Sequence, residues 1–153
     1  MISLKSLDSS LMGFLFALLL FPGFSVIAAG NALAGDIAIK GYDTVAYFKD
    51  GKAVKGSGSF TFSWHNMTWH FHSKENRELF AAGPEKYAPQ YDGYCAWAMT
   101  EERKAITDPE VWTIVDGKLY LNCSKTAYEK WSKDIPGHIK KADAIWLKLK
   151  GAH

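Results

Sequence analysis

Residues 60–72 read FTFSWHNMTWHFH, and this stretch decides the fold class. Aromatic and polar residues alternate on both sides of a short interruption, and such period-two patterning is typical of β-strands. We therefore predict a hairpin with strands at 60–64 and 68–72 and a turn at 65–67. The aromatic side chains are expected to face the core and the polar ones to face away from it.

A second hairpin is predicted further along the chain. Residues 111–115 and 118–121 flank Asp116-Gly117, a dipeptide that favours a two-residue hairpin turn. Residues 37–48 alternate only loosely before the turn signal Asp50-Gly51. Residues 91–98 are apolar and interrupted by Gly93, and their pattern does not decide between a strand and a loop.

Serine residues mark the expected starts of two helices. Ser73 is placed to cap a helix over 74–82 that ends at Gly83, and Ser124 to cap one that ends near residue 133. Other expected features are a helical turn over 84–87 ended by Pro89, a chain break at Pro136-Gly137, and a last helix over about 138–150 with Ile139, Ala142, Trp146 and Leu149 on one stripe. Together these elements predict an α+β fold: a small single domain of antiparallel β-hairpins packed with short helices.

Residues 1–34 differ from the rest of the chain. Lys5 and Asp8 are the charged residues there, 11–29 is apolar or small, and Ala32-Leu33-Ala34 supplies small residues before a cleavage site. This order is typical of a secretory signal peptide, with an uncleaved membrane anchor as the alternative. We expect cleavage after Ala34, a domain over 35–153, a periplasmic or secreted location, and no membrane contact after cleavage.

The composition excludes several classes of protein. The 153 residues are enough for one domain, and 48% of them are hydrophobic, which argues against disorder. The net charge of +2 is too small to indicate a nucleic-acid partner. The sequence contains no serine-centred elbow, phosphate loop or H-E-x-x-H motif, so a hydrolase or a nucleotide cofactor lacks support.

Several motifs in sequence order resemble the exported YHS-domain proteins. The resemblance covers nearly all of residues 35–153, and Phe71-His72-Ser73 stands at the aromatic-His-Ser signature. The other matching stretches are 41–48, 69–73 with Asn76, Arg77, Phe80, Pro84 and Tyr87, 93–98, 116–122, and 135–139 through Ala142-Asp143.

This resemblance implies more about chemistry than about a defined activity. YHS domains are related to small metal-binding modules with Cys ligands, including modules attached to copper-transporting ATPases. Ala46 and Asn76 stand where metal-binding relatives carry Cys, so a thiolate-rich zinc or copper site does not carry over directly. In exported members the position of Cys95 is sometimes selenocysteine, which implies a reactive group or a soft-metal ligand at Cys95.

The two cysteines allow several interpretations. A thiolate at Cys95 can attack electrophiles or bind Cu(I), and Met99 could add a thioether if the segment is helical. A buried, inert thiol is the alternative reading of Cys95. Cys123 can pair with Cys95 in a disulfide, since an oxidising compartment is expected. Such a bridge would weaken the interpretations of Cys95 as a metal ligand and as a nucleophile.

Histidines supply the remaining candidate ligands. His70 and His72 are two residues apart on a predicted strand, so both rings point to one face, with His65 near the turn. A polar, solvated sheet face is the favoured reading of His70, and His72 is balanced between the two readings. His138, at a predicted helix start, can bind a metal, accept a proton from a thiol, or make a structural hydrogen bond.

Three functions remain open at the level of sequence. The first is a periplasmic or secreted protein that binds a soft metal, with copper favoured over zinc, at Cys95 with His72, His138 or Met99. The second is a thiol redox protein in which Cys95 reacts and His138 tunes it. The third is a small domain that binds a periplasmic protein partner through aromatic residues. The sequence does not decide whether the protein is an enzyme.

Overall fold

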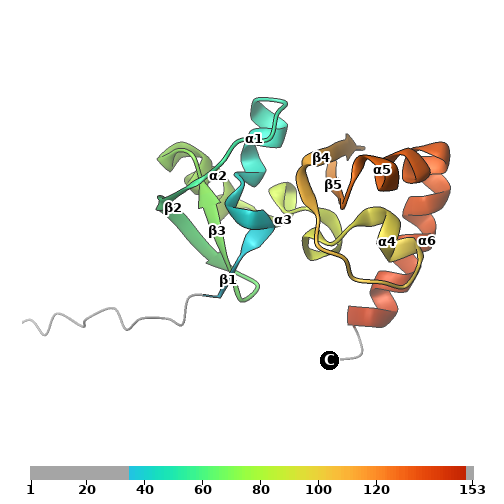
Figure 1. The fold of residues 1–153 in the computed structure, drawn as a ribbon. Coiled ribbons are helices and arrows are strands. Elements are labelled where there is room, and N and C mark those ends of the chain that lie inside the picture. Colours follow the sequence, from blue (N-terminus) through green and yellow to red (C-terminus); the bar gives the residue numbers. More distant parts are fainter. Residues whose placement is uncertain (1–34, 151–153) are drawn as a thin grey trace, which may run out of the picture. The chain divides into compact units, whose positions relative to one another are not determined.

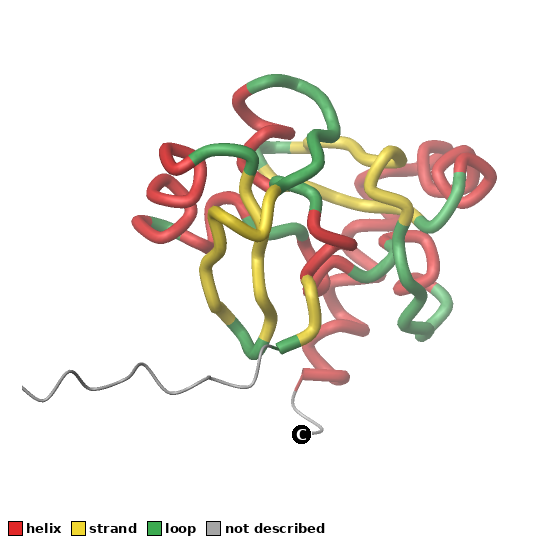
Figure 2. Tube along the Cα trace, turned by 60° about the vertical axis from the view of Figure 1, so that its left-hand side comes forward, coloured by secondary structure: helices red, strands yellow, loops and turns green. Residues whose placement is uncertain are grey.

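A computed structural model describes residues 35–150 of the chain. All of them belong to one compact unit, Leu33–His153. Its helices and its two small sheets confirm the α+β class (Figures 1 and 2). The predicted signal peptide at 1–34 lies outside the described residues. None of the helices described between residues 35 and 150 has the length and apolar character needed to cross a membrane.

The first sheet contains the hairpin that the sequence predicts. Strands β2 (Ser57–Trp64) and β3 (Met67–Phe71) pair antiparallel with Phe62 opposite Trp69, and β1 (Asp36–Ile37) adds to β3 in parallel. The turn differs from the prediction, because it consists of His65 and Asn66 alone. Both turn residues have positive φ, which matches the twist of a tight hairpin.

The aromatic face of this hairpin packs on helix α2 (Lys74–Ala82). Phe80 of α2 lies 5.0 Å from the ring of Trp69 and 5.2 Å from that of Phe71, measured between centroids. The Ser73 hydroxyl accepts the Asn76 N–H at 3.1 Å, so the predicted helix and its cap are confirmed. Helix α3 (Pro84–Tyr87) follows as expected.

The loosely alternating stretch before the first hairpin forms a helix. A 3₁₀ turn, η1 (Ala38–Gly41), leads into helix α1 (Thr44–Lys49). Asp43 is fully buried and caps α1. Residues 43–47 are all buried, so this short segment belongs to the core.

The second sheet confirms the second predicted hairpin. Strands β4 (Asp108–Val115) and β5 (Lys118–Asn122) pair antiparallel around Asp116-Gly117, and both turn residues have positive φ. Leu119 and Leu121 of β5 are fully buried and form a cluster with Tyr47 of α1. The pairing register shifts between Asp108 and Trp112.

The undecided segment 91–98 contains parts of two helical elements. These are a 3₁₀ turn, η2 (Gln90–Gly93), and helix α4 (Ala96–Thr100). The predicted helix after Ser124 is confirmed as α5 (Lys125–Trp131), continued by the 3₁₀ turn η3 (Ser132–Asp134).

The last helix begins earlier than the sequence indicates. Helix α6 spans Ile135–Lys150, so the predicted break at Pro136-Gly137 and start at His138 are wrong. Proline is tolerated in the first turn of a helix, where its missing N–H has no intrahelical acceptor. The Asp134 carboxylate accepts the Gly137 N–H at 3.1 Å and satisfies that free donor. The predicted stripe is confirmed, with Ala142 fully buried beside Tyr120 and Trp131.

Candidate functional site

Cys95 lies fully buried at the N-terminus of α4. Its Sγ accepts the backbone N–H of Cys123 at 3.1 Å and that of Ala98 at 3.5 Å, so the sulfur caps the helix. The Cys95 N–H is itself bound to the carbonyl of Ala105 at 3.0 Å. These contacts hold the sulfur atom against the end of β5.

Cys123 follows β5 directly and lies beside Cys95. Cys123 is half-buried, and both residues are free thiols, so the structure holds them in contact without a disulfide. Burial raises the pKa of the Cys95 thiol, and a hydrogen bond involving the Cys123 side chain adds to that increase. The N–H of Ala98 acts in the opposite direction, because it stabilises a negative sulfur.

Asn122 is a buried polar neighbour that the sequence did not indicate. Its Oδ1 accepts the Trp97 N–H at 3.1 Å and the Cys95 thiol at 3.7 Å. The Asn122 Nδ2 is buried and has no hydrogen-bond partner within residues 35–150. The amide oxygen is therefore shared between the start of α4 and the Cys95 thiol.

His72 belongs to a different cluster, around Asp43. The Asp43 Oδ2 accepts the His72 Nδ1–H at 2.6 Å, the His72 backbone N–H at 2.9 Å and the Asn76 Nδ2–H at 2.9 Å. The Oδ1 accepts the N–H groups of Val45 and Ala46 at 2.9 and 3.3 Å. With Nδ1 donating to Asp43, Nε2 is the ring atom of His72 that is left for another partner.

His138 lies inside α6 and makes a structural hydrogen bond. Its Nδ1 donates to the carbonyl oxygen of Trp131 at 2.7 Å. The imidazole also meets the Trp97 ring edge to face, with centroids 5.2 Å apart. His138 therefore makes the structural hydrogen bond that was one of its three predicted roles.

The candidate ligands do not form a three-residue metal group. Among residues 35–150, no set of three or more His, Cys, Asp or Glu side chains is arranged to hold an ion. The structure pairs Cys95 with Cys123 and pairs His72 with Asp43. Met99 lies in helix α4, as the copper reading required. However, its side chain packs in a hydrophobic cluster with Tyr91 and Trp131, whereas Cys95 belongs to a different cluster, with Ala98 and Ala127.

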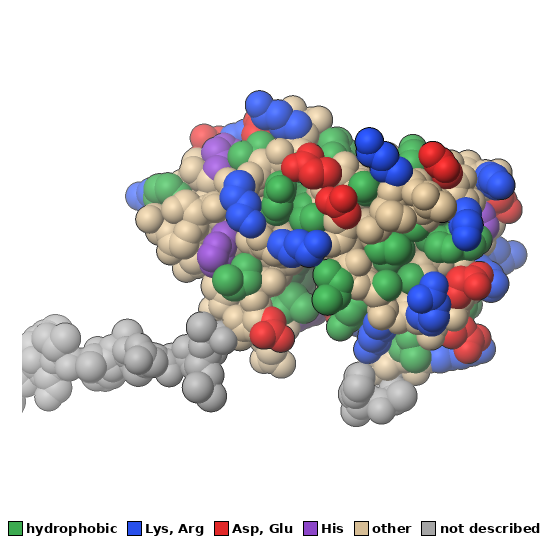
Figure 3. Space-filling model, viewed as in Figure 1, with side chains coloured by type: hydrophobic (Ala, Val, Ile, Leu, Met, Phe, Trp, Pro, Cys, Tyr) green, Lys and Arg blue, Asp and Glu red, His purple; other side chains and the backbone are tan. Residues whose placement is uncertain are grey.

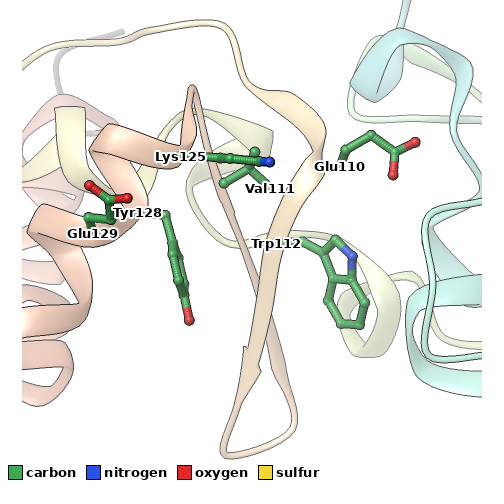
Figure 4. Close-up of a pocket in the computed structure, with 6 residues that line it drawn as sticks. All are labelled: Glu110, Val111, Trp112, Lys125, Tyr128 and Glu129. Carbon is green, nitrogen blue, oxygen red and sulfur yellow. The ribbon is translucent and has the colours of Figure 1, made fainter.

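A groove between β4 and α5 is separate from these residues. Its volume is about 430 Å³, and in Figure 4 Lys125 of α5 lies over Val111 of β4. Trp112, Tyr128, Glu110 and Glu129 complete the lining. The groove therefore contains aromatic and charged side chains but neither thiol nor imidazole.

Neither the surface charge nor a comparison with known proteins assigns a function to these residues. On the face drawn in Figure 3, acidic and basic side chains are interspersed. No protein-family model, curated protein or solved structure matches the chain.

Proposed function

We propose that the protein is an exported YHS-like domain that binds Cu(I) through the sulfur atoms of Cys95 and Cys123. The observation that carries the proposal is the contact between these residues, in which the Cys123 N–H lies 3.1 Å from the Cys95 sulfur. Such a protein would buffer the metal or pass it to a partner outside the cytoplasm. Its expected partners are the metal ion and a periplasmic protein.

The chemistry of the two sulfurs favours copper over zinc. Soft thiolate ligands select Cu(I), whereas structural zinc usually takes four ligands. Two N–H groups, from Ala98 and Cys123, already point at the Cys95 sulfur. They would stabilise the thiolate that a metal requires, because a metal ligand must be deprotonated.

The second ligand in this proposal is Cys123 instead of a histidine. Cys123 contacts Cys95 directly, whereas the Nδ1 atoms of His72 and His138 are bound to Asp43 and to the Trp131 carbonyl. A role for either imidazole would use Nε2. The experiment below separates the two ligand sets.

The test is an anaerobic Cu(I) titration, against a competing chelator, of reduced protein purified after expression of the full chain. We expect one tightly bound Cu(I) per chain, and loss of that binding in Cys95→Ser and in Cys123→Ser. The matched controls are His72→Asn and His138→Asn, in which the amide nitrogen keeps a donor near the position of Nδ1 and Nε2 is removed. Both controls are expected to bind Cu(I) as the wild type does.

Other outcomes would change the assignment. Weak binding by the wild type, or unchanged binding in both cysteine variants, would contradict the copper proposal. Loss of binding in a histidine control with retention in Cys123→Ser would restore the Cys–His ligand set. Sequencing of the N-terminus after export tests the location separately, and a mature chain that begins at Gly35 is expected.

A further inference from the structure

The two thiols of the pair differ sharply in access to solvent. Cys95 is 0% exposed, whereas Cys123 is only half-buried. In thiol–disulfide exchange, the attacking sulfur must reach a sulfur atom of the disulfide that it attacks. The rate therefore depends on the accessibility of the thiol as well as on its pKa. An external disulfide therefore meets Cys123 first.

We infer that Cys123 exchanges with external disulfides and that the buried Cys95 then resolves the mixed disulfide, so that the pair is a reversible dithiol. This activity goes beyond metal binding, although it uses the same two sulfur atoms. It assigns the first attack to Cys123, in contrast to the expectation from sequence that Cys95 is the reactive thiol.

The first step consumes an external disulfide, R–S–S–R′. The Cys123 sulfur attacks one of its sulfur atoms, the Cys123–S–S–R bond forms, and the R–S–S–R′ bond breaks. The leaving R′–S⁻ takes up the proton that Cys123 has lost. One external thiol is released, and the protein carries a mixed disulfide at Cys123.

The second step is internal. The Cys95 sulfur attacks the sulfur of Cys123, the Cys95–S–S–Cys123 bond forms, and R–S⁻ leaves with the proton from Cys95. In total, two protein thiols are oxidised and one external disulfide is reduced to two thiols. Reduction by an external dithiol reverses both steps.

The surroundings of Cys95 suit the resolving role. The N–H groups of Ala98 and Cys123, at 3.5 and 3.1 Å, stabilise negative charge on the attacking sulfur. The hydrogen bond from Cys95 N–H to the Ala105 carbonyl fixes its backbone. Burial keeps Cys95 away from external reagents until Cys123 carries a disulfide next to it.

The test uses oxidised glutathione as the external disulfide, under anaerobic conditions, with reduced protein purified after expression of the full chain. Samples are acid-quenched at intervals, alkylated, and analysed by intact mass and peptide mapping. The wild type is expected to lose two hydrogen atoms in mass and to yield a Cys95–Cys123 peptide. At early times the glutathione adduct should map to Cys123.

Two variants isolate the steps. Cys95→Ser keeps an oxygen that can cap α4, and it should accumulate a stable glutathione adduct on Cys123. Cys123→Ser should form its adduct, on Cys95, at no more than about a tenth of the rate seen for Cys95→Ser. A tenfold difference corresponds to a free energy of about 1.4 kcal/mol for opening the structure around the buried thiol. Circular dichroism checks that each variant is folded. If a variant fails to fold, the peptide map of the wild type still shows which cysteine carries the early adduct.

Three results would overturn the inference: early adducts on Cys95, equal rates in the two variants, or a wild-type protein that keeps a glutathione adduct and forms no internal disulfide. The copper proposal is tested on reduced protein alone, so either can fail without the other. If both hold, the oxidised protein should no longer bind Cu(I) tightly, and reduction should restore binding.

Discussion

The Asp43 carboxylate and the His72 imidazole are joined by a hydrogen bond of 2.6 Å between Oδ2 and Nδ1, across 29 positions of the chain. The carboxylate is fully buried, whereas the His72 side chain is 36% exposed. One buried charge therefore fixes the tautomer and orientation of an imidazole at the surface. The same carboxylate caps α1 and binds Asn76 of α2, so it connects three segments.

The first prediction concerns this buried carboxylate. Asp43→Asn should lower the free energy of unfolding by about 3 kcal/mol, because an amide group would leave buried donors unsatisfied. Urea unfolding followed by circular dichroism measures the change. Asp116→Asn is the matched control, since the same chemical change occurs in an exposed turn, and it should alter stability by less than about 0.5 kcal/mol. Equal effects at the two positions would contradict the role of Asp43.

The second prediction concerns the serine caps of α2 and α5. Ser73→Ala and Ser124→Ala should each lower the free energy of unfolding by about 1 kcal/mol, since each hydroxyl accepts a helix N–H at 3.1 Å. The exposed Ser132 instead donates to the Glu129 carbonyl. Ser132→Ala is therefore the control and should change stability by less than about 0.5 kcal/mol. Thermal melts of all three variants test this ranking, and a control as damaging as the caps would refute it.

The third prediction is a loss of stability at alkaline pH. Burial raises the pKa of Cys95 above 9.0 and that of Tyr120 from 10.0 to about 12, and it also raises the pKa values of Tyr47 and Tyr91. The unfolded chain thus loses these protons at lower pH than the folded protein, so stability falls as pH rises. The free energy of unfolding should be retained below about pH 9 and decline from there to pH 12.

Urea unfolding over this pH range measures the decline. Tyr120→Phe removes one of the ionising groups and should make the fall between pH 10 and pH 12 shallower. A free energy of unfolding that stays constant or increases over this range would show that the buried hydroxyls do not titrate as described.

The fourth prediction concerns proton release by the proposed copper site. The Cys95 thiol must lose its proton to bind Cu(I), and its pKa is raised by burial. The apparent affinity should therefore rise by at least about tenfold for each pH unit between pH 6 and pH 8. Competition titrations at three pH values measure the slope. An affinity independent of pH would mean that Cys95 is not a ligand.

The local features of the fold could be predicted from the sequence. The first hairpin follows from alternating aromatic and polar residues, and the second follows from the turn signal Asp116-Gly117. Helices α2 and α5 follow from Ser73 and Ser124. Each of these signals lies within a few residues of the structure it specifies. The start of α6 could not be placed in this way, because Pro136 and Gly137 break most helices but are tolerated in a first turn.

The site could be predicted only in part, for a related reason. The sequence indicates Cys95 as the centre of a candidate site and Cys123 as a possible disulfide partner, whereas the structure places His72 and His138 in other contacts. The hydrogen bond from the Cys95 thiol to Asn122 spans 27 positions, and that from Asn76 to Asp43 spans 33. No local pattern marks such contacts. A capping position for Asp43 was available as a signal, since Asp is favoured immediately before a helix.

The sulfur of Cys95 is also the cap of α4, and this couples chemical state to conformation. Modification of the sulfur would change its hydrogen bond with the Ala98 N–H and its contact with the Asn122 amide, which also accepts the Trp97 N–H. Helix α4 contacts both α5 and α6. A reaction at this atom would thus alter the hydrogen bonds at the start of a helix that packs on α5 and α6, and the indole of Trp97 lies close enough to report the change by fluorescence.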